Sequence, residues 1–277
     1  MIYDIIIIGS GIVGISAAVY CGRLNLKSLV IGRERGGTIT KTHIVENYPG
    51  FKSLSGIELA DKMFEHAMDY DAEIKDEEVL SIKKTGKNYF NVKTSKSEYS
   101  SKTILFCTGS EWKKLNVPGE KEFSNKGVHY CALCDGPLYK NKIVAVVGGG
   151  DSAVKEALLL SKFASKVYII ARTELRPEPI NLERMKREKK IQSLLGYEVK
   201  EIVGTKFMEH VKLNKKFNGL EILKLDGLFI EIGHIPLSEL AVKISVELNK
   251  KNEIIIDKES KTNIKGVYAA GDVTDTR

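Results

Sequence analysis

The chain has 277 residues, of which 43% are hydrophobic and 29% are charged. These values exclude a disordered chain and are typical of a globular protein with two domains or one large one. The net charge is +7, but the basic residues are not interleaved with aromatic residues as they are on a nucleic-acid-binding surface. No nucleic-acid partner is therefore expected. The apolar run Ile5–Ile8 is too short to cross a bilayer, and no signal-peptide pattern precedes it, which predicts a cytoplasmic protein without membrane contact.

The first predicted unit is a strand over 4–8, a glycine fingerprint over 9–14, and a helix that ends near Leu24. A second strand is predicted over 27–31. In this pattern the first glycine permits a tight turn, the second lets the backbone approach a pyrophosphate, and the third allows helix and strand to pack closely. Glu34 follows twenty residues past the last glycine, where an acid can accept ribose hydroxyls. The unit therefore predicts a site for a dinucleotide without a 2′-phosphate.

A further strand is predicted over 102–109. Proline and glycine then interrupt the pattern at 117–120, and we interpret this segment as a link into a second domain. Cys21 and Cys107 lie in apolar segments and are interpreted as core residues, because a free cysteine behaves as a small hydrophobe.

The segment 131–136 reads Cys-Ala-Leu-Cys-Asp-Gly. Two cysteines at this spacing can form a redox-active pair, in which one attacks a partner disulfide and the other resolves the mixed disulfide. Asp135 can move protons on and off sulfur if its carboxyl retains a proton. A zinc half-site is the alternative, but it needs two more ligands, and His129 alone does not complete the set. No metal is expected.

The order of parts in the first unit returns later in the chain. A strand over 143–147 leads into the fingerprint 148–153, a helix that ends near Phe163, and a strand over 166–170. Arg172 follows, and a guanidinium at this place suits a 2′-phosphate. Because continuous apolar runs are typical of buried parallel strands, two such units predict an α/β fold with two Rossmann-like nucleotide-binding domains.

Two more strands are predicted, over 226–233 and 266–272, with a return link near 235–237. The second domain is therefore expected to be inserted into the first. The predicted boundaries place residues 1–114 and 242–277 in the first domain and residues 115–241 in the second.

These motifs resemble those of low-molecular-weight thioredoxin reductases, which are FAD-dependent pyridine nucleotide-disulfide oxidoreductases, and the resemblance covers nearly the whole chain. The cysteine motif before the second fingerprint is specific to this family among flavoproteins that bind two nucleotides. The matching segments are GSGIVG at 9–14, ENYPG at 46–50, CTG at 107–109, CALCDG at 131–136, VGGGDSAVKEALLL at 147–160, IGHIP at 232–236 and YAAGDVTD at 268–275.

The resemblance implies that hydride passes from NADPH to FAD, and that the flavin then reduces the cysteine pair. It further implies that Cys134 lies nearer the flavin, that Cys131 attacks the disulfide of thioredoxin or a thioredoxin-like protein, and that Asp135 is the acid. A homodimer is also implied. The FAD site would comprise Gly9, Ser10, Gly11, Gly14, Glu34, Arg35, Gly36, Gly37, Asn47, Thr108, Gly109, Gly271 and Asp272. The NADPH site would comprise Gly148, Gly150, Asp151, Ser152, Ala153, Arg172 and Arg176.

The sequence departs from the family at two places. NADPH-using members carry a His-Arg-Arg motif with a further arginine, whereas residues 171–176 match only two of the arginines and add Glu174, which repels phosphate. NADH and a non-nicotinamide donor are therefore alternatives to NADPH. The sequence given ends at Arg277, shortly after the motif that precedes a flavin-contacting helix in the family. A reductase for another dithiol protein and a non-catalytic redox sensor are the rival functions.

Overall fold

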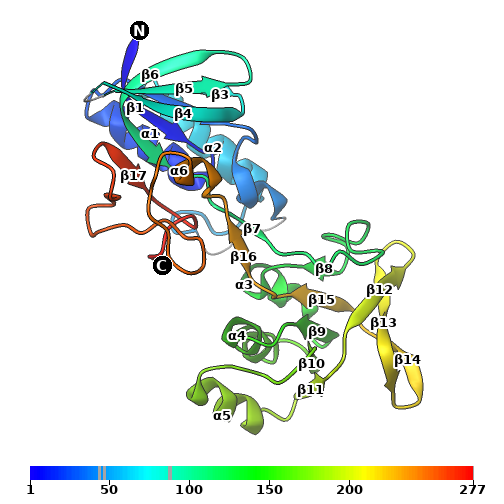
Figure 1. Cartoon of the computed structure of the whole chain (residues 1–277). Coiled ribbons are helices and arrows are strands. Elements are labelled where there is room, and N and C mark those ends of the chain that lie inside the picture. Colours follow the sequence, from blue (N-terminus) through cyan, green and yellow to red (C-terminus); the bar gives the residue numbers. More distant parts are fainter. Residues whose placement is uncertain (43–44, 46–47, 87–88, 277) are drawn as a thin grey trace. The chain divides into compact units, whose positions relative to one another are not determined.

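The computed structural model describes residues 1–42, 45, 48–86 and 89–276. Two compact units make up the chain, whose elements are labelled in Figure 1. The first unit joins Met1–Glu111 to His234–Arg277, and the second comprises Trp112–Gly233. One unit is thus inserted into the other, but the divisions lie three and eight residues earlier in the chain than predicted.

A mixed sheet forms the centre of the first unit. Strands β1, β2, β3, β6 and β17 are parallel to one another, whereas β5 pairs antiparallel with both β6 and β4. The first residues of β6 pair with β5 and its last residues pair with β17. In the described residues the order is β3 (Glu73–Asp76), β2 (Ser28–Gly32), β1 (Ile2–Ile8), β6 (Glu98–Phe106), β5 (Tyr89–Thr94) and β4 (Val79–Thr85), with β17 (Val267–Ala269) beside β6.

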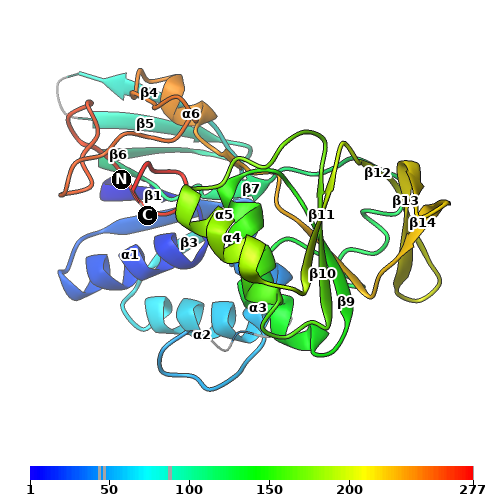
Figure 2. The ribbon, with the colours of Figure 1, turned by 90° about the horizontal axis from the view of Figure 1, so that it is seen from below.

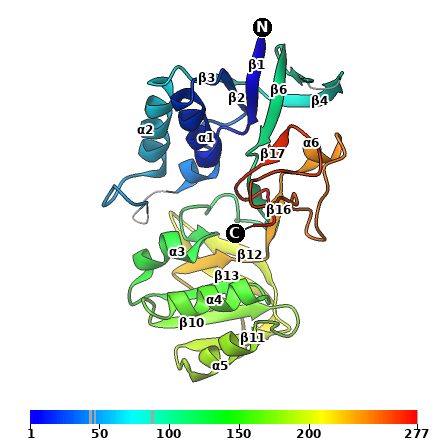
Figure 3. The ribbon, with the colours of Figure 1, turned by 90° about the vertical axis from the view of Figure 1, so that its left-hand side faces the viewer.

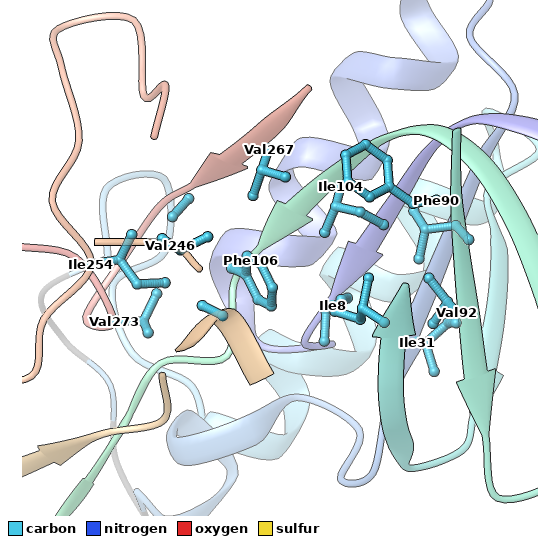
Figure 4. Packing of buried hydrophobic residues seen from close by; sticks show 14 of the residues in the cluster. Ile8, Ile31, Phe90, Val92, Ile104, Phe106, Val246, Ile254, Val267 and Val273 are labelled. Carbon is cyan, nitrogen blue, oxygen red and sulfur yellow. The ribbon is translucent and has the colours of Figure 1, made fainter. Parts of the chain in front are cut away.

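Hydrophobic residues cover both faces of this sheet, as the continuous apolar sequence of β1 requires. Helices α1 (Ile12–Arg23) and α2 (Gly56–Met68) lie together on one face, as Figure 2 shows. Ile7 on that face packs among residues of both helices. The other face carries a second cluster around Ile8, Phe90 and Phe106, shown in Figure 4.

A parallel sheet forms the centre of the second unit. Helix α4 (Asp151–Leu160) covers one face of this sheet (Figure 3). Val144 and Val146 of the sheet share a hydrophobic cluster with Ala157 and Leu160 of the helix. The sheet order is β11 (Ile191–Leu195), β10 (Lys166–Ala171), β9 (Ile143–Val147), β15 (Gly227–Ile230) and β8 (Val128–His129). An antiparallel sheet of β12 (Val199–Gly204), β13 (Met208–Phe217) and β14 (Leu220–Lys224) packs on the other face.

The segment 117–120 does not link the two units, which corrects the prediction. Val117 packs against the core of the second unit, and the carbonyl of Pro118 accepts a hydrogen bond from the Ile202 N–H at 2.9 Å. The Glu120 side chain is buried and accepts three hydrogen bonds. Its donors are the backbone N–H groups of Leu115 and Asn116 and the hydroxyl of Tyr130.

The chain returns to the first unit at His234 rather than after residue 241. Leu240 and Ala241 of the short helix α6 (Glu239–Val242) pack in the core of the first unit, which explains the earlier boundary. Strand β7 (Ser110–Trp112) contains the first division, and β16 (His234–Pro236) begins directly after the second; the two strands pair as a two-stranded sheet. Within the described segments, no helix has the length and apolar character that a membrane crossing requires.

Candidate active site

The first fingerprint has two glycines that the fold requires and one that leaves space. Gly9 has a φ of +115°, and a Cβ there would overlap the carbonyl oxygen of Cys107. A Cβ at Gly14 would overlap the carbonyl oxygen of Gly9. By contrast, a Cβ at Gly11 would meet only the Gly36 oxygen, at 3.8 Å. The backbone is therefore accessible at Gly11, where a pyrophosphate would approach.

The loop after β2 lies directly against this fingerprint, because β1 and β2 are parallel neighbours. Ser10 accepts the Gly36 N–H at its carbonyl, at 3.0 Å, and donates its hydroxyl to the carbonyl of Glu34 at 3.1 Å. A Cβ at Gly37 would lie 3.3 Å from the Cα of Gly11. The Glu34 carboxylate is exposed at this edge, in position to accept hydroxyl hydrogen bonds.

Other predicted flavin-site residues follow β6 and β17 at the same edge of the sheet. Gly271 has a φ of +80°, and a Cβ there would lie 2.9 Å from Val13 at the start of α1. The Thr108 hydroxyl donates to the carbonyl of Leu237 at 2.7 Å, and Gly109 has a φ of +70°. Asp272 is exposed.

Arg35 takes a different direction from its neighbours in the glycine loop. Its guanidinium lies 4.2 Å from the ring centre of Phe64 and 3.7 Å from the Asp61 carboxylate, so it is held against α2. Asn47 lies outside the described residues.

The second fingerprint repeats this geometry at the end of β9. Gly148 has a φ of +158°, and a Cβ there would overlap the carbonyl oxygen of Glu231. A Cβ at Gly150 would have no atom within 4 Å, and Ala153 is fully buried where helix and strand pack. Ser152 is exposed in the first turn of α4.

Asp151 holds neighbouring protein segments with its carboxylate. The Lys155 ammonium at 2.6 Å is the main cause of its pKa being lowered to about 2. The same carboxylate accepts the Glu178 N–H and the Asn181 amide, both at 2.8 Å. Asp151 thereby fixes the start of α5 (Pro179–Arg187) beside the fingerprint.

The segment that contains Arg172 and Arg176 runs along the glycine loop. The Arg176 N–H donates to the carbonyl of Gly149 at 2.7 Å, and a Cβ at Gly149 would lie 3.3 Å from the Glu174 carbonyl oxygen. The side chains of Arg172, Glu174 and Arg176 are all exposed. Two cations and one anion thus lie at the end of β10, where the adenosine end of a dinucleotide is expected.

Cys131 and Cys134 form a disulfide, with Cα atoms 5.4 Å apart. The pair follows β8 and lies at the same sheet edge as the second fingerprint, because β8, β15 and β9 are parallel. Cys131 precedes the one-turn helix α3 (Ala132–Asp135), and its sulfur accepts the Cys134 N–H at 3.2 Å. Both cysteines are half-buried, so the pair is accessible. In the described segments, no group of three or more metal-binding side chains occurs.

Asp135 contacts a buried aromatic cluster. Its Oδ2 lies 3.1 Å from Nδ1 of His129, within ion-pair distance but without hydrogen-bond alignment. Nε2 of His129 lies 2.7 Å from the Tyr139 hydroxyl, in the 3₁₀ turn η2 (Gly136–Tyr139). The His129 ring stacks on Phe229, with centroids 5.3 Å apart. From the sequence, His129 is a candidate metal ligand only. Its pairing with Asp135 cannot be predicted there, because it depends on the turn of α3.

Glu156 of α4 adds a second carboxyl beside the disulfide. Its Oε1 accepts the Ala132 N–H at 2.9 Å, whereas its buried Oε2 has no hydrogen-bond partner. The pKa of Glu156 is raised to about 8, mainly by burial; the Ala132 hydrogen bond opposes this rise, and the charges of Glu231 and Asp135 add to it. Glu156 therefore carries a proton at neutral pH. Sequence reasoning does not identify this carboxyl, since Glu156 occupies an ordinary helical position.

We expect the Glu156→Gln substitution to make the second unit more stable at pH 8 than the native chain. The folded chain holds the Glu156 proton up to about pH 8, whereas the unfolded chain releases it near 4.5, so stability falls as pH rises between these values. The limiting slope is about 1.4 kcal/mol per pH unit. Urea unfolding followed by fluorescence of Trp112, the single tryptophan, should show a gain of ~1–3 kcal/mol at pH 8 relative to pH 5.5.

The exposed Glu183→Gln variant on α5 is the control and should show no such difference. Equal effects of Glu156→Gln at both pH values would contradict a buried, protonated carboxyl.

Comparisons with known proteins agree with this arrangement. The family model described as pyridine nucleotide-disulphide oxidoreductase matches residues 3–277. The thioredoxin reductase of Bacillus subtilis (strain 168) is 43% identical over 98% of this chain and 87% of its own length. The solved thioredoxin reductase of Streptococcus pyogenes MGAS5005 is 36% identical, with a TM-score of 0.89 over 100% of this chain and 91% of that one.

A solved ferredoxin-flavin thioredoxin reductase from Clostridium acetobutylicum is 32% identical, with a TM-score of 0.50 over 100% of this chain and 90% of that one. The fold, both fingerprints and the disulfide agree with these relationships. The chain therefore belongs to the thioredoxin reductases of the pyridine nucleotide-disulphide oxidoreductase family.

Proposed function

We propose that this protein is a thioredoxin-disulfide reductase that passes electrons from NADPH through FAD to the Cys131–Cys134 disulfide and on to a thioredoxin or thioredoxin-like protein. The observation that carries the proposal is the position of the disulfide. It lies beside a carboxylic acid and at the same sheet edge as a nucleotide fingerprint. Family membership supports the same activity.

The residues of the first unit fit FAD. The open backbone at Gly11, the adjacent glycine loop at 36–37 and the exposed Glu34 form a cradle that suits an adenine dinucleotide. Bound FAD would supply the electron pair that opens the disulfide. The conformations of Gly9 and Gly14 keep this cradle in shape.

The second unit supplies the thiol chemistry. In the reduced pair, the Cys134 N–H at the sulfur of Cys131 stabilises a Cys131 thiolate. This thiolate attacks a partner disulfide, and the departing partner sulfur takes a proton from Asp135. Cys134 then attacks the sulfur of Cys131, which releases the reduced partner and restores the enzyme disulfide. Both steps need an accessible pair, and both cysteines are half-buried.

The electron donor is proposed to be NADPH, on the basis of Arg172 and Arg176. Both guanidinium groups are exposed beside the second fingerprint, where a 2′-phosphate would bind. Glu174 between them opposes the phosphate, so NADH is the runner-up donor. The ferredoxin-named relative makes a non-nicotinamide donor a third outcome to test.

Replacing both arginines, as Arg172→Ser with Arg176→Ser, is expected to raise the KM for NADPH by at least ~100-fold, because each charge-assisted hydrogen bond contributes roughly 1.5–3 kcal/mol. The KM for NADH should change little. Steady-state kinetics with both donors measures the effect. Arg187→Ser, which removes an exposed cation paired with Glu183 on α5, is the matched control. An equal loss with both donors would contradict a phosphate-binding role.

The function itself is tested by anaerobic titration of the flavin-loaded protein with NADPH and, separately, NADH, followed by addition of oxidised bacterial thioredoxin. Loss of flavin absorbance followed by formation of thioredoxin thiols is the expected result. If neither nicotinamide reduces the flavin, the electron donor is not a nicotinamide and the NADPH assignment is wrong. Reduced flavin that leaves thioredoxin oxidised would refute the substrate assignment.

A homodimer and a cytoplasmic location remain predictions from the family resemblance. Sedimentation of the flavin-loaded protein checks the first.

A further inference from the structure

Two buried side-chain atoms in the described part of the chain have no hydrogen-bond partner, and both lie beside the redox-active turn. They are Nδ1 of His129 and Oε2 of Glu156. Leaving such an atom unpaired destabilises the folded state. Unpaired buried atoms of this kind often have a functional role. His129 is the more informative of the two, because its Nδ1 lies 3.1 Å from the proposed catalytic acid.

Tyr139 determines which nitrogen of His129 carries the proton. Burial, together with the charges of Asp135 and Asp226, raises the pKa of Tyr139, so its hydroxyl keeps its proton. That hydroxyl lies 2.7 Å from Nε2, which is its one hydrogen-bond partner among the described residues, so we assign the hydroxyl as donor and Nε2 as acceptor. In the neutral imidazole the other nitrogen, Nδ1, then carries the N–H. This N–H faces Oδ2 of Asp135.

The imidazole has little freedom to turn away from this position. The His129 side chain is 4% exposed, stacks on Phe229 and meets the Tyr139 ring edge-on, with centroids 5.4 Å apart. The Asp135 carboxyl is less restricted, because the terminal torsion of aspartate is broad. Rotation about this torsion would bring a carboxyl oxygen into line with Nδ1. The titratable groups around Asp135 are His129 of β8, Tyr139 of η2 and Glu156 of α4, with Asp226 before β15 acting on Tyr139.

We propose that His129 is a positioning residue that orients the Asp135 carboxyl by donating from Nδ1, and so sets the proton transfer to the departing partner sulfur. The proposal rests on the disulfide reductase function proposed above. In the step concerned, a bond forms between the Cys131 sulfur and one partner sulfur, while the partner disulfide breaks. The electron pair leaves on the second partner sulfur, which takes the proton from Asp135. The Cys134 thiol then returns a proton to Asp135 and its sulfur bonds to the Cys131 sulfur, while the mixed disulfide breaks and the first partner sulfur leaves with the electron pair as a thiolate.

Two substitutions separate this role from simple packing. In His129→Asn, the side-chain amide replaces Nδ1 and can still donate to Asp135. In His129→Gln, the amide lies at the place of Nε2 and meets Tyr139 instead. Both variants remove the same ring from the Phe229 stack. Tyr139→Phe is a third variant, which removes the group that fixes the His129 tautomer.

The expected result is a loss of ~10–100-fold in kcat/KM for bacterial thioredoxin in His129→Gln, and a loss within about threefold in His129→Asn. A purely structural role would not let the Asn variant rescue turnover that the Gln variant loses. Tyr139→Phe should fall between them. Ferricyanide reduction, which bypasses the cysteine pair, reports on folding and on the flavin in each variant.

Equal losses in the Asn and Gln variants would make His129 a packing residue only and overturn the proposal. Failure of the proposed function would look different, since the native chain itself would then leave thioredoxin oxidised.

Discussion

Replacing Cys134 with serine is expected to lower the turnover of thioredoxin by at least ~10³-fold, because the enzyme can neither resolve a mixed disulfide nor store two electrons as a dithiol. The same variant should retain Cys131 as an attacking thiol, since the Cys134 N–H that contacts its sulfur belongs to the backbone. Incubation with oxidised thioredoxin should then accumulate a covalent complex, visible on a non-reducing gel and cleaved by dithiothreitol.

The companion variant Cys131→Ser distinguishes the two cysteines. It should lose turnover to the same extent but form little covalent complex, because the proposed nucleophile is absent. Cys21→Ala, which removes a buried thiol in the first unit, serves as the control and should keep turnover near that of the native chain. A complex that forms with Cys131→Ser instead would exchange the proposed roles of the two sulfurs.

The second large effect is expected at Gly9, where substitution acts on the fold itself. Gly9→Ala places a Cβ on the carbonyl of Cys107 and a side chain at a φ of +115°. The cost should be about 3 kcal/mol or more in the free energy of unfolding, because strain and overlap act together. Denaturant unfolding of the flavin-free protein, followed by circular dichroism, measures this loss.

Gly11→Ala is the matched control for Gly9, two residues along the same loop. Its added Cβ has no atom closer than 3.8 Å and its φ is −75°, so the flavin-free protein should keep its stability within ~1 kcal/mol. The methyl group would still occupy the backbone surface that a pyrophosphate needs, and the Kd for FAD should rise by at least ~10-fold. A Gly11→Ala protein that binds FAD normally would contradict the proposed cradle.

The central strands could be predicted from the sequence because both of their faces are buried. The run predicted over 143–147 agrees with β9 residue for residue, and the one over 166–170 falls one residue short of β10. Such strands have only one environment, so a continuous apolar run is enough to identify them. The family fold could be predicted for the same reason.

The antiparallel strands of both units could not be predicted from continuous apolar runs. In β13, charged residues dominate the exposed positions, and the strand is defined by pairing with β12 and β14 rather than by its own composition. The Pro-Gly pair at 118–119 predicted a domain link, yet backbone pairing with β12 draws this segment into the second unit. Turn residues mark a change of direction and do not show which core the neighbouring side chains join.

The residues of the candidate site likewise fall into those that local sequence predicts and those that depend on tertiary packing. The fingerprint spacing predicts a special backbone conformation at Gly9 and Gly148, and both have a positive φ, whereas Gly11 is extended and leaves open space. The partners of Asp135 could not be predicted, because His129 and Tyr139 approach it only after α3 and η2 have turned the chain. Glu156 reaches α3 from a separate helix, so its raised pKa depends on tertiary packing alone.

The pairing of β17 with the last residues of β6 has a consequence for how the protein is made. All the strands of the inserted unit have been synthesised once the ribosome has passed Gly233, whereas the first sheet still lacks the strand that covers the end of β6. Because domains generally fold as units during synthesis, the inserted unit can form its core first. The N-terminal half of the first unit must meanwhile wait with an open sheet edge, a state in which chaperones would be most needed.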